Sequence, residues 1–253
     1  MNLTGIILTR NEADHIAECI RSLWFCDEVI VFDSYSDDQT TTIAEANGAR
    51  VIQHAFLNYA SQRNAALAAV DEQTEWVLFI DADERVSSVL AEEILQAMQE
   101  PDYAGWQVPR HNYIFGKLTL GAGWYPDYQV RLLRVGQAHY DPDRQVHELV
   151  VLDGPLGTLQ APLTHYNYSD LAQFHRKQRS YSQYDAKILF QQGVKPMPQN
   201  YVLQALRQFW WRFVTLKGYQ DGTHGLLLSG LMAWYEGRKY WLLRQMWQET
   251  QQP

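Results

Sequence analysis

Hydrophobic and polar residues follow two alternating patterns over the first hundred positions. Short, mainly apolar runs predict strands at residues 3–8, 29–32, 50–53 and 77–80. Unbroken apolar runs are typical of strands that are buried on both faces. Between these runs the pattern is helical, over residues 16–24, 41–46 and 60–70, with Asn11 as the expected cap of the first helix. Strands that alternate with helices predict an α/β domain, with a mostly parallel sheet and helices on both faces.

The pattern changes after this region. Residues 105–168 combine short strand-like runs with Gly and Pro turns and many aromatic residues. They predict an irregular region rather than further strand–helix units. From residue 170 the spacing is helical again, and its four large apolar residues on one face are Leu203, Leu206, Trp210 and Phe213. We therefore predict one domain over residues 1–169, with parts 1–100 and 101–169, and a helical extension over residues 170–253.

Two carboxylates directly follow the predicted strand at residues 77–80. They are Asp81 and Asp83, one residue apart. In open α/β sheets ligands bind at the carboxyl ends of the strands, and this spacing can direct both side chains at one hard cation. A cation held in this way is suited to gripping a diphosphate. About one Asp-x-Asp triplet is expected by chance in a chain of this length, and such an Asp is also a common turn former, so the triplet alone leaves both interpretations open.

Polar residues also end the first two predicted strands. Asn11 and Glu12 follow the first and Asp33 ends the second. A carboxylate in the position of Asp33 can accept the imide N–H of uracil or ribose hydroxyls, or it can form an Asx-turn that opens the polar loop 34–40. No Gly-x-Gly-x-x-Gly or Gly-x-x-x-x-Gly-Lys motif is present, so ordinary dinucleotide-binding and P-loop functions are unsupported.

The net charge of −8 is unevenly distributed. Residues 170–253 hold 11 Lys and Arg against 5 Asp and Glu, a net of +6, together with five of the nine Trp. Aromatic residues interleaved with cations on amphipathic helices are typical of a surface that lies on anionic lipid. The alternative is that these helices pack on the rest of the chain and expose their cations to water. Nucleic acid is disfavoured as a partner because the acidic remainder would repel it.

Targeting signals are absent from the pattern. The longest apolar stretch near the C-terminus, residues 225–235, is far shorter than the roughly 18 residues of a membrane span, and the first residues lack a basic region. Cys19 and Cys26 are expected about two turns apart, too far for a disulfide. We predict a cytoplasmic protein, peripheral on the inner face of the plasma membrane.

Four motifs, in this order, resemble family 2 glycosyltransferases. They are residues 8–12 (LTRNE), 33–40 (DSYSDDQT), 62–67 (QRNAAL) and 81–85 (DADER). Two further segments are similar to the branch of lipopolysaccharide core β-1,4-glucosyltransferases, namely residues 123–134 (GWYPDYQVRLLR) and 146–148 (VHE). The resemblance implies the Rossmann-like GT-A nucleotide-diphospho-sugar transferase fold. One departure is that Tyr35 and Asp37 stand where the family usually has Gly and Thr.

The resemblance implies a role for each residue of these motifs. Thr9 and Glu12 would line the nucleoside pocket, and Asp33 would hold the uracil or ribose. Asp83, helped by Asp81, would hold Mg²⁺ or Mn²⁺ against the diphosphate, and Ala82 between them would touch the donor. Arg63 would lie near the diphosphate, where a guanidinium suits phosphate oxygens. Without the resemblance, Arg63 would be interpreted as a solvated helix residue.

A transferase also needs a base to take the proton of the attacking hydroxyl. The resemblance favours Glu148, with Asp127 as the alternative. The remaining candidates for contacts with acceptor or phosphate are His147, Trp124, Tyr125 and Arg131. His147 can instead hydrogen-bond a neighbour, and the two aromatic residues can equally belong to a core.

Together these features imply a metal-dependent, inverting glycosyltransferase. It would move a hexose, glucose from UDP-glucose in the first instance, to a hydroxyl of a lipid-linked saccharide such as a lipopolysaccharide inner core. Residues 1–100 would bind the donor and 101–169 would face the acceptor. The alternatives are transfer to a protein or another envelope polymer, and an inactive protein that binds a sugar nucleotide. A nucleotidyltransferase is disfavoured because a Gly-rich basic loop after the first strand is missing.

Overall fold

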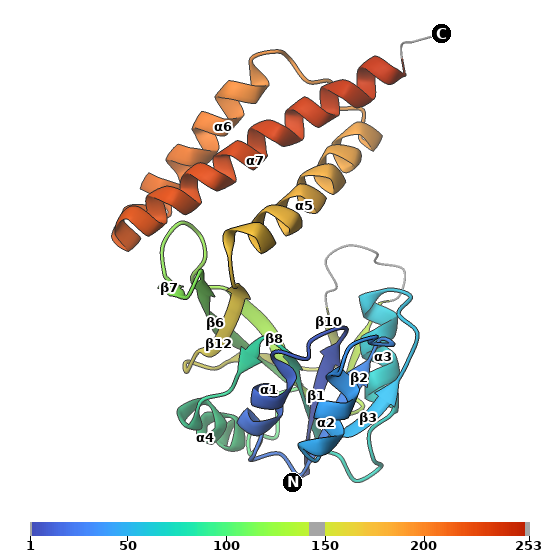
Figure 1. The fold of residues 1–253 in the computed structure, drawn as a ribbon. Coiled ribbons are helices and arrows are strands. Elements are labelled where there is room, and N and C mark those ends of the chain that lie inside the picture. Colours follow the sequence, from blue (N-terminus) through green and yellow to red (C-terminus); the bar gives the residue numbers. More distant parts are fainter. Residues whose placement is uncertain (1, 142–149, 251–253) are drawn as a thin grey trace. The chain divides into compact units, whose positions relative to one another are not determined.

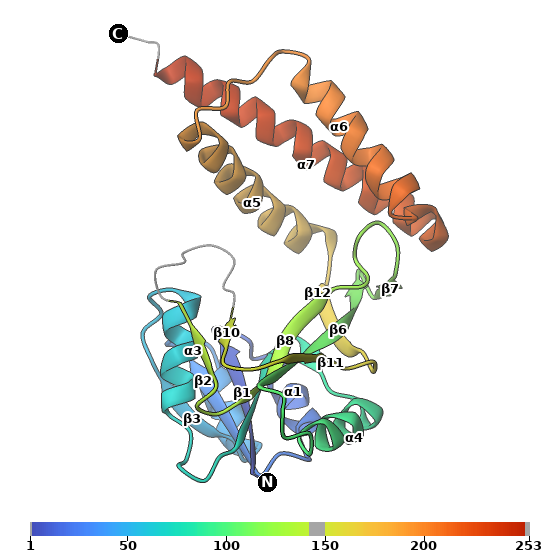
Figure 2. The same cartoon turned by 180° about the vertical axis from the view of Figure 1, so that it is seen from behind.

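The computed structural model describes residues 2–141 and 150–250 (Figures 1 and 2). The chain divides into two compact units. The first contains Met1–Arg110 and Tyr128–His165, and the second contains His111–Asp127 and Tyr166–Pro253. Glu148 and His147, predicted as the base and its neighbour, lie outside the described residues.

The first unit is built on a mixed sheet whose predicted parallel part is present. β1 (Leu3–Thr9) pairs in parallel with both β2 (Glu28–Asp33) and β4 (Trp76–Asp81). β3 (Arg50–Gln53) extends the sheet in parallel beyond β2. On the other side, β8 (Tyr128–Arg134) is antiparallel to β4, and β6 (Gly105–Ile114) is antiparallel to β8. The strand order is β3-β2-β1-β4-β8-β6-β12-β5.

Shorter strands complete the chain's β structure. They are β5 (Glu84–Arg85), β7 (Lys117–Thr119), β9 (Ala138–Tyr140), β10 (Val150–Leu152), β11 (Leu156–Thr158) and β12 (Leu163–Tyr168). β12 pairs antiparallel with β5, the short strand that directly follows the turn after β4. The predicted irregular character of residues 105–168 corresponds to these short strands.

Helices cover both faces of the sheet. They are α1 (Ile16–Ser22), α2 (Thr40–Ala46), α3 (Tyr59–Ala68) and α4 (Ser88–Ala97). Because successive side chains of a strand point to opposite faces, Ile7 packs in a core with α1, α2 and α4, whereas Ile6 packs in a second core with α3. The α/β fold with helices on both faces is therefore confirmed.

Capping side chains explain where two of these helices begin. Asn58 accepts a hydrogen bond from Ser61 N at 2.8 Å, and Ser87 accepts one from Leu90 N at 3.2 Å. The prediction that Asn11 caps the first helix is wrong, since α1 begins at Ile16 after His15. Asn11 instead has a positive φ of 58°, and its side-chain oxygen accepts a hydrogen bond from Asp37 N at 3.0 Å. It ties the first strand's end to loop 34–40.

The second unit contains the predicted C-terminal helices. α7 (Gly222–Glu249) packs against α5 (Leu171–Gln191) and α6 (Asn200–Trp210). A short π-helix, η1 (Trp211–Thr215), and a 3₁₀ turn, η2 (Gly218–Asp221), join α6 to α7. At Gly225 a Cβ would stand 1.8 Å from the carbonyl oxygen of Gly218, so only glycine permits this approach.

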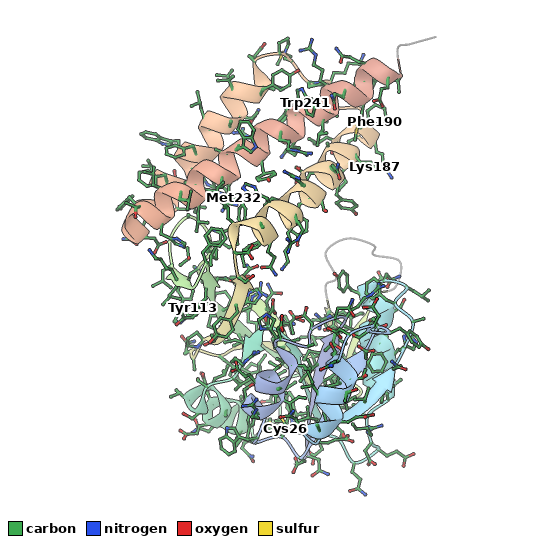
Figure 3. The ribbon with its side chains drawn as sticks, viewed as in Figure 1. Cys26, Tyr113, Lys187, Phe190, Met232 and Trp241 are labelled. Carbon is green, nitrogen blue, oxygen red and sulfur yellow. The ribbon has the colours of Figure 1, made fainter. Side chains whose placement is uncertain are left out.

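Aromatic side chains form the core of this second unit. Phe174 and Tyr235 are buried with Leu228, and Trp124 packs against this cluster. Near the far end of α5, Phe190, which is labelled in Figure 3, lies against Trp247 of α7 with ring centroids 4.9 Å apart. In the part of the chain that the structure describes, no helix is both long and apolar enough to cross a membrane.

Candidate active site at the sheet edge

The carboxyl ends of three neighbouring strands bring the predicted site residues together. Thr9 at the end of β1 lies opposite Asp33 at the end of β2, and Leu8 lies opposite Asp81 at the end of β4. Since all three strands are parallel, their last side chains share one edge of the sheet. The predicted grouping of Thr9, Asp33 and Asp81 is thus a direct result of strand register.

Asp33 is fully buried and accepts four hydrogen bonds. The hydroxyl groups of Thr9 (3.1 Å) and Ser36 donate to Oδ1, and Ser36 N (2.9 Å) and Gln53 Nε2 (3.3 Å) donate to Oδ2. The bond from Ser36 N comes from three residues further along the chain, one residue beyond the spacing of an Asx-turn, and it fixes the start of loop 34–40. Because a carboxylate has about four lone-pair positions, a ligand N–H can reach Asp33 only if one of these donors gives way.

Loop 34–40 is fastened to the end of β1. Ser36 Oγ accepts a hydrogen bond from Asn11 N, and Thr40 Oγ1 accepts one from Glu12 N, each at 2.8 Å. Tyr35 takes a φ of 56°, which explains why glycine usually stands there, and its side chain is 58% exposed. The first two motifs therefore form one hydrogen-bonded structure next to Asp33.

Asp81 lies among arginines. Arg131 from β8 donates to both of its carboxylate oxygens, and Arg63 Nη2 stands 4.0 Å from Oδ1. Burial disfavours the charged carboxylate, but the positive charges of Arg131 and Arg63 outweigh it and hold the pKa of Asp81 well below its usual range. The Asp81 side chain is still 37% exposed, so it borders the open edge of the sheet as an ionised group.

Glu84 belongs to the same network of charged residues. It is fully buried, accepts a hydrogen bond from Asp81 N at 2.9 Å, and bonds to Arg131 Nη2 at 2.5 Å and Arg110 Nη1 at 3.3 Å. Burial lowers the pKa of Arg131, but Asp81 and Glu84 raise it further, so Arg131 is always charged. Arg131, predicted as a contact of acceptor or phosphate, is only 2% exposed. It positions Asp81 and Glu84 instead.

Removing Arg131 is expected to destabilise the fold strongly. Arg131→Met removes a cationic partner from the buried Glu84, and breaking a buried ion pair typically costs about 3–5 kcal/mol. Urea unfolding followed by circular dichroism measures the change. Arg50→Met is the matched control, because Arg50 pairs with Glu28 at 2.7 Å on the surface, where such a pair contributes about 0–1 kcal/mol. Equal costs for the two variants would contradict the stabilising role of the network.

Asp83 occupies the turn between β4 and β5. Its carboxylate oxygen Oδ2 lies 3.5 Å from Nε2 of His165, which β12 brings next to Glu84. The Asp83 side chain is 22% exposed, whereas Ala82 is buried. Among the described residues no three metal-ligating side chains gather. One or two carboxylates together with substrate phosphates are nevertheless the usual Mg²⁺ site, so Asp83 and Asp81 fit the implied cation.

Arg63 is not the solvated helix residue that its sequence context alone suggests. Its side chain is 14% exposed, and its guanidinium lies 5.1 Å from the ring centre of Phe79 and 5.6 Å from that of Tyr140. The rings hold it beside Asp81. A desolvated guanidinium in this position is suited to an anionic ligand at the sheet edge.

Three predicted residues belong to the second unit. Asp127 Oδ2 accepts a hydrogen bond from Asn112 Nδ2 at 3.1 Å. Trp124 packs edge-on against Tyr168 with centroids 6.1 Å apart, in agreement with the core alternative, and Tyr125 lies 5.3 Å from the His111 ring. These three sets of contacts all lie within the second unit.

Sequence reasoning missed Glu84, Arg110 and His165. Glu84 carried a signal, because it continues the acidic motif directly after Asp83. Arg110 and His165 carried none, since only the pairing of distant strands brings them to the turn.

Comparisons with known proteins show the family of this chain. The family model described as Glycosyl transferase family 2 matches residues 4–141. Lipopolysaccharide core biosynthesis glycosyltransferase LpsC of Rhizobium meliloti (strain 1021) is 29% identical over 91% of this chain and 90% of its own length. An uncharacterized glycosyltransferase of Rickettsia bellii (strain RML369-C) is 32% identical over 83% of this chain and 74% of its own.

Two solved structures of bacterial proteins align with most of this chain. Residues 1–349 of S. aureus TarS align with a TM-score of 0.49 at 16% identity, covering 99% of this chain and 92% of that one. Glucosyl-3-phosphoglycerate synthase of Mycobacterium tuberculosis, in complex with Mn²⁺, UDP and glucosyl-3-phosphoglycerate, aligns with a TM-score of 0.48 at 20% identity, covering 77% and 81%.

Proposed function

The chain belongs to glycosyl transferase family 2 and is a glycosyltransferase, and from this premise we propose that it moves a hexose from a UDP-sugar to a hydroxyl of a lipid-linked saccharide. The observation that carries the proposal is the joint placement of Asp33, Asp81 and Arg63 at one sheet edge. This edge combines polar side chains suited to a base or ribose with an ionised carboxylate and a desolvated guanidinium.

The nucleoside would bind next to β2. Asp33 and Thr9 lie there under the fastened loop 34–40. The longest of the four hydrogen bonds to Asp33 comes from Gln53 at 3.3 Å, so Gln53 is the donor that we expect to give way to the imide N–H of uracil. Glu12 would lie beside the nucleoside, where its backbone N–H donates to Thr40 Oγ1 at the end of the same loop.

The diphosphate would bind next to β4. Arg63 would pair with its oxygens, and Asp83, with Asp81, would hold Mg²⁺ or Mn²⁺. The chemistry supplied by such a bound ion is neutralisation of the charge on the departing nucleoside diphosphate. Arg131 keeps Asp81 ionised and in place, and His165 fixes the side chain of Asp83 from β12. Glu148 would take the proton of the attacking hydroxyl as the sugar is transferred with inversion.

A lipid-linked saccharide, such as a lipopolysaccharide core, is the acceptor class that we propose. The relative LpsC is named for lipopolysaccharide core biosynthesis. The basic, aromatic-rich residues 170–253 support docking on an anionic membrane surface, where such an acceptor is anchored. Together these features support the proposal that the reaction occurs at the inner face of the membrane.

Thermal unfolding with a panel of sugar nucleotides tests the donor. We expect UDP-glucose with Mn²⁺ to raise the midpoint by about 5–10 °C at a hundred times its Kd, and GDP-mannose or dTDP-glucose to raise it much less. Chelation of the metal by EDTA should remove most of the shift. A larger shift with GDP-mannose would overturn the uridine assignment, and a shift unaffected by EDTA would overturn the metal.

A further inference from the structure

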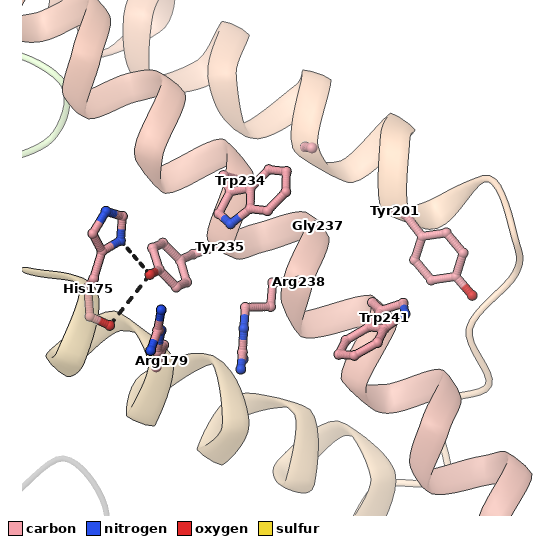
Figure 4. Close-up of a pocket in the computed structure, with 9 residues that line it drawn as sticks. His175, Arg179, Tyr201, Trp234, Tyr235, Gly237, Arg238 and Trp241 are labelled. Carbon is pink, nitrogen blue, oxygen red and sulfur yellow. Dashed lines mark hydrogen bonds between the residues drawn. The ribbon is translucent and has the colours of Figure 1, made fainter.

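The helices of the second unit enclose a pocket that the proposed transfer reaction does not use. Its volume is about 680 Å³, within the roughly 300–1,000 Å³ of pockets that take small molecules. All of its lining residues come from α5, α6 and α7 (Figure 4). It is therefore described completely within one unit of the chain.

Small residues create this space between the helices. Gly237 on α7 faces α6 so closely that a Cβ would stand 3.0 Å from the carbonyl oxygen of Tyr201, and 3.6 Å from the Cβ of Ala205. Gly237, Tyr201 and Ala205 all line the pocket. Because neither glycine nor alanine fills the volume beside the contact, the pocket stays open toward α5.

One side of the pocket is aromatic. Trp234 and Trp241 lie seven residues apart on α7, and hence on the same helix face, and they are 70% and 49% exposed. Figure 4 shows the indoles of Trp234 and Trp241 along α7 and the ring of Tyr201 on α6. Exposed indole rings at the mouth of an apolar pocket leave apolar surface in contact with water, which is unfavourable unless a ligand or partner covers it.

The other side of the pocket is cationic. Arg179 from α5 and Arg238 from α7 lie between these two helices in Figure 4. Arg238 donates a hydrogen bond to Ser182 Oγ at 2.9 Å. The lining contains no Asp or Glu, so no carboxylate of the pocket neutralises the two guanidinium groups. An occupant must therefore combine an apolar body with an anionic head.

An apolar surface adjoins the pocket. α6 exposes Val202, Leu203, Leu206 and Trp210, which are 57–63% exposed. They are next to the lining residues Tyr201 and Ala205 along the same helix. A stripe of this kind beside cations is suited to the interface of an anionic bilayer, where lipid would be present at high local concentration.

We propose that this pocket binds one anionic lipid, with its phosphate between Arg179 and Arg238 and its acyl chain against Trp234 and Trp241. The inference rests on the proposed membrane docking of this unit. It adds a specific lipid site to that docking, separate from the sheet edge where the donor would bind.

A short-chain lipid tests the site without a membrane. The whole protein is titrated calorimetrically with dihexanoyl phosphatidic acid below its critical micelle concentration. We expect saturable binding with a negative heat-capacity change, because apolar surface is buried. Dihexanoyl phosphatidylcholine, which lacks net negative charge, and inorganic phosphate, which lacks the chains, should bind at least about tenfold more weakly, as the loss of either contact implies.

Variants locate the binding. Arg179→Gln and Ala205→Trp, the second filling the pocket, should each weaken binding by at least about tenfold. Arg176→Gln is the matched control, because Arg176 is exposed on the same helix but does not line the pocket. Unchanged unfolding midpoints verify that the variants fold. Equal affinities of Arg179→Gln and Arg176→Gln, or equal binding of phosphate alone, would overturn the site.

Separate measurements distinguish this site from the functions on which it rests. Flotation with phosphatidylglycerol vesicles reports membrane docking, and the UDP-glucose shift reports the donor site. Flotation without short-chain binding overturns the pocket and leaves docking in place, whereas loss of both overturns both. A third outcome is that the unaltered protein is dimeric in buffer and binds no short-chain lipid, whereas the Ala205→Trp variant is monomeric. This outcome would show that a second copy of the chain covers the pocket, and it would also overturn the proposed lipid site.

Discussion

Replacing Glu148 with Gln is expected to lower sugar transfer by about 10²–10⁴-fold while donor affinity stays unchanged. Glutamine has nearly the same size as glutamate but cannot take up the proton of the attacking hydroxyl, and a positioned general base typically contributes this factor. Binding of the donor's pyrophosphate does not involve this proton, so the affinity for the donor should be kept. Release of UDP in the presence of acceptor gives kcat, and calorimetric titration with UDP-glucose and Mn²⁺ gives the affinity.

The matching Asp127→Asn variant separates the two candidate bases. Asp127 accepts a hydrogen bond from Asn112, and asparagine can still accept it through its side-chain oxygen, so the local structure should be kept. We expect this variant to retain most of its turnover. A large loss in Asp127→Asn together with near-normal turnover in Glu148→Gln would move the role of base to Asp127.

Sequence pattern predicts much of the sheet edge because the information there is local. The run at residues 77–80 is apolar at every position. In the structure this run lies in β4, whose side chains pack in two cores, one on each side of the sheet. Parallel register then brings Thr9 and Asp33 together without further information. The site residues that end these strands are predictable for the same reason.

Residues joined by distant pairings are not predictable in this way. Arg131 reaches Asp81 across 50 positions, and His165 reaches Asp83 only because β12 pairs with β5. A charged residue within a strand pattern gives no sign of which carboxylate it will meet. The sequence therefore proposed a ligand contact for Arg131, where the structure has a buried ion pair.

Helical periodicity likewise shows which residues share a face and leaves open what covers that face. Leu203, Leu206 and Trp210 were predicted on one face, and in α6 they are 57%, 60% and 63% exposed. A hydrophobic stripe of the same spacing would pack against another helix in a different fold. The arrangement of α5, α6 and α7 decides whether this face of α6 is covered or exposed.

The two carboxylates of the Asp-x-Asp motif have different surroundings in the structure. Both oxygens of Asp81 accept hydrogen bonds from Arg131, so its capacity to bind a cation is already partly used. Asp83 Oδ2 lies 3.5 Å from Nε2 of His165. We therefore assign most of the cation's protein ligation to Asp83 and the structural part to Asp81.

Asp83→Asn is accordingly expected to weaken UDP-glucose binding in Mn²⁺ by about 100-fold or more and to leave stability nearly unchanged. The neutral amide is a poor ligand for a hard cation, and the cation's contribution to phosphate binding is several kcal/mol. Calorimetric titration with and without Mn²⁺ measures the loss: the variant should bind equally weakly in both, as the unaltered protein does in EDTA. Urea unfolding reports stability in parallel.

Asp71→Asn is the control for Asp83→Asn, because Asp71 is an exposed turn residue that precedes β4, at the opposite end of that strand. It should retain the full effect of Mn²⁺. Asp81→Asn should behave differently from both, since it removes the charge that faces Arg131 and so lowers the free energy of unfolding. If Asp81→Asn abolishes the Mn²⁺ effect at unchanged stability while Asp83→Asn keeps it, the assignment is reversed: Asp81 is the ligand, and the ion pair with Arg131 opens when the donor binds.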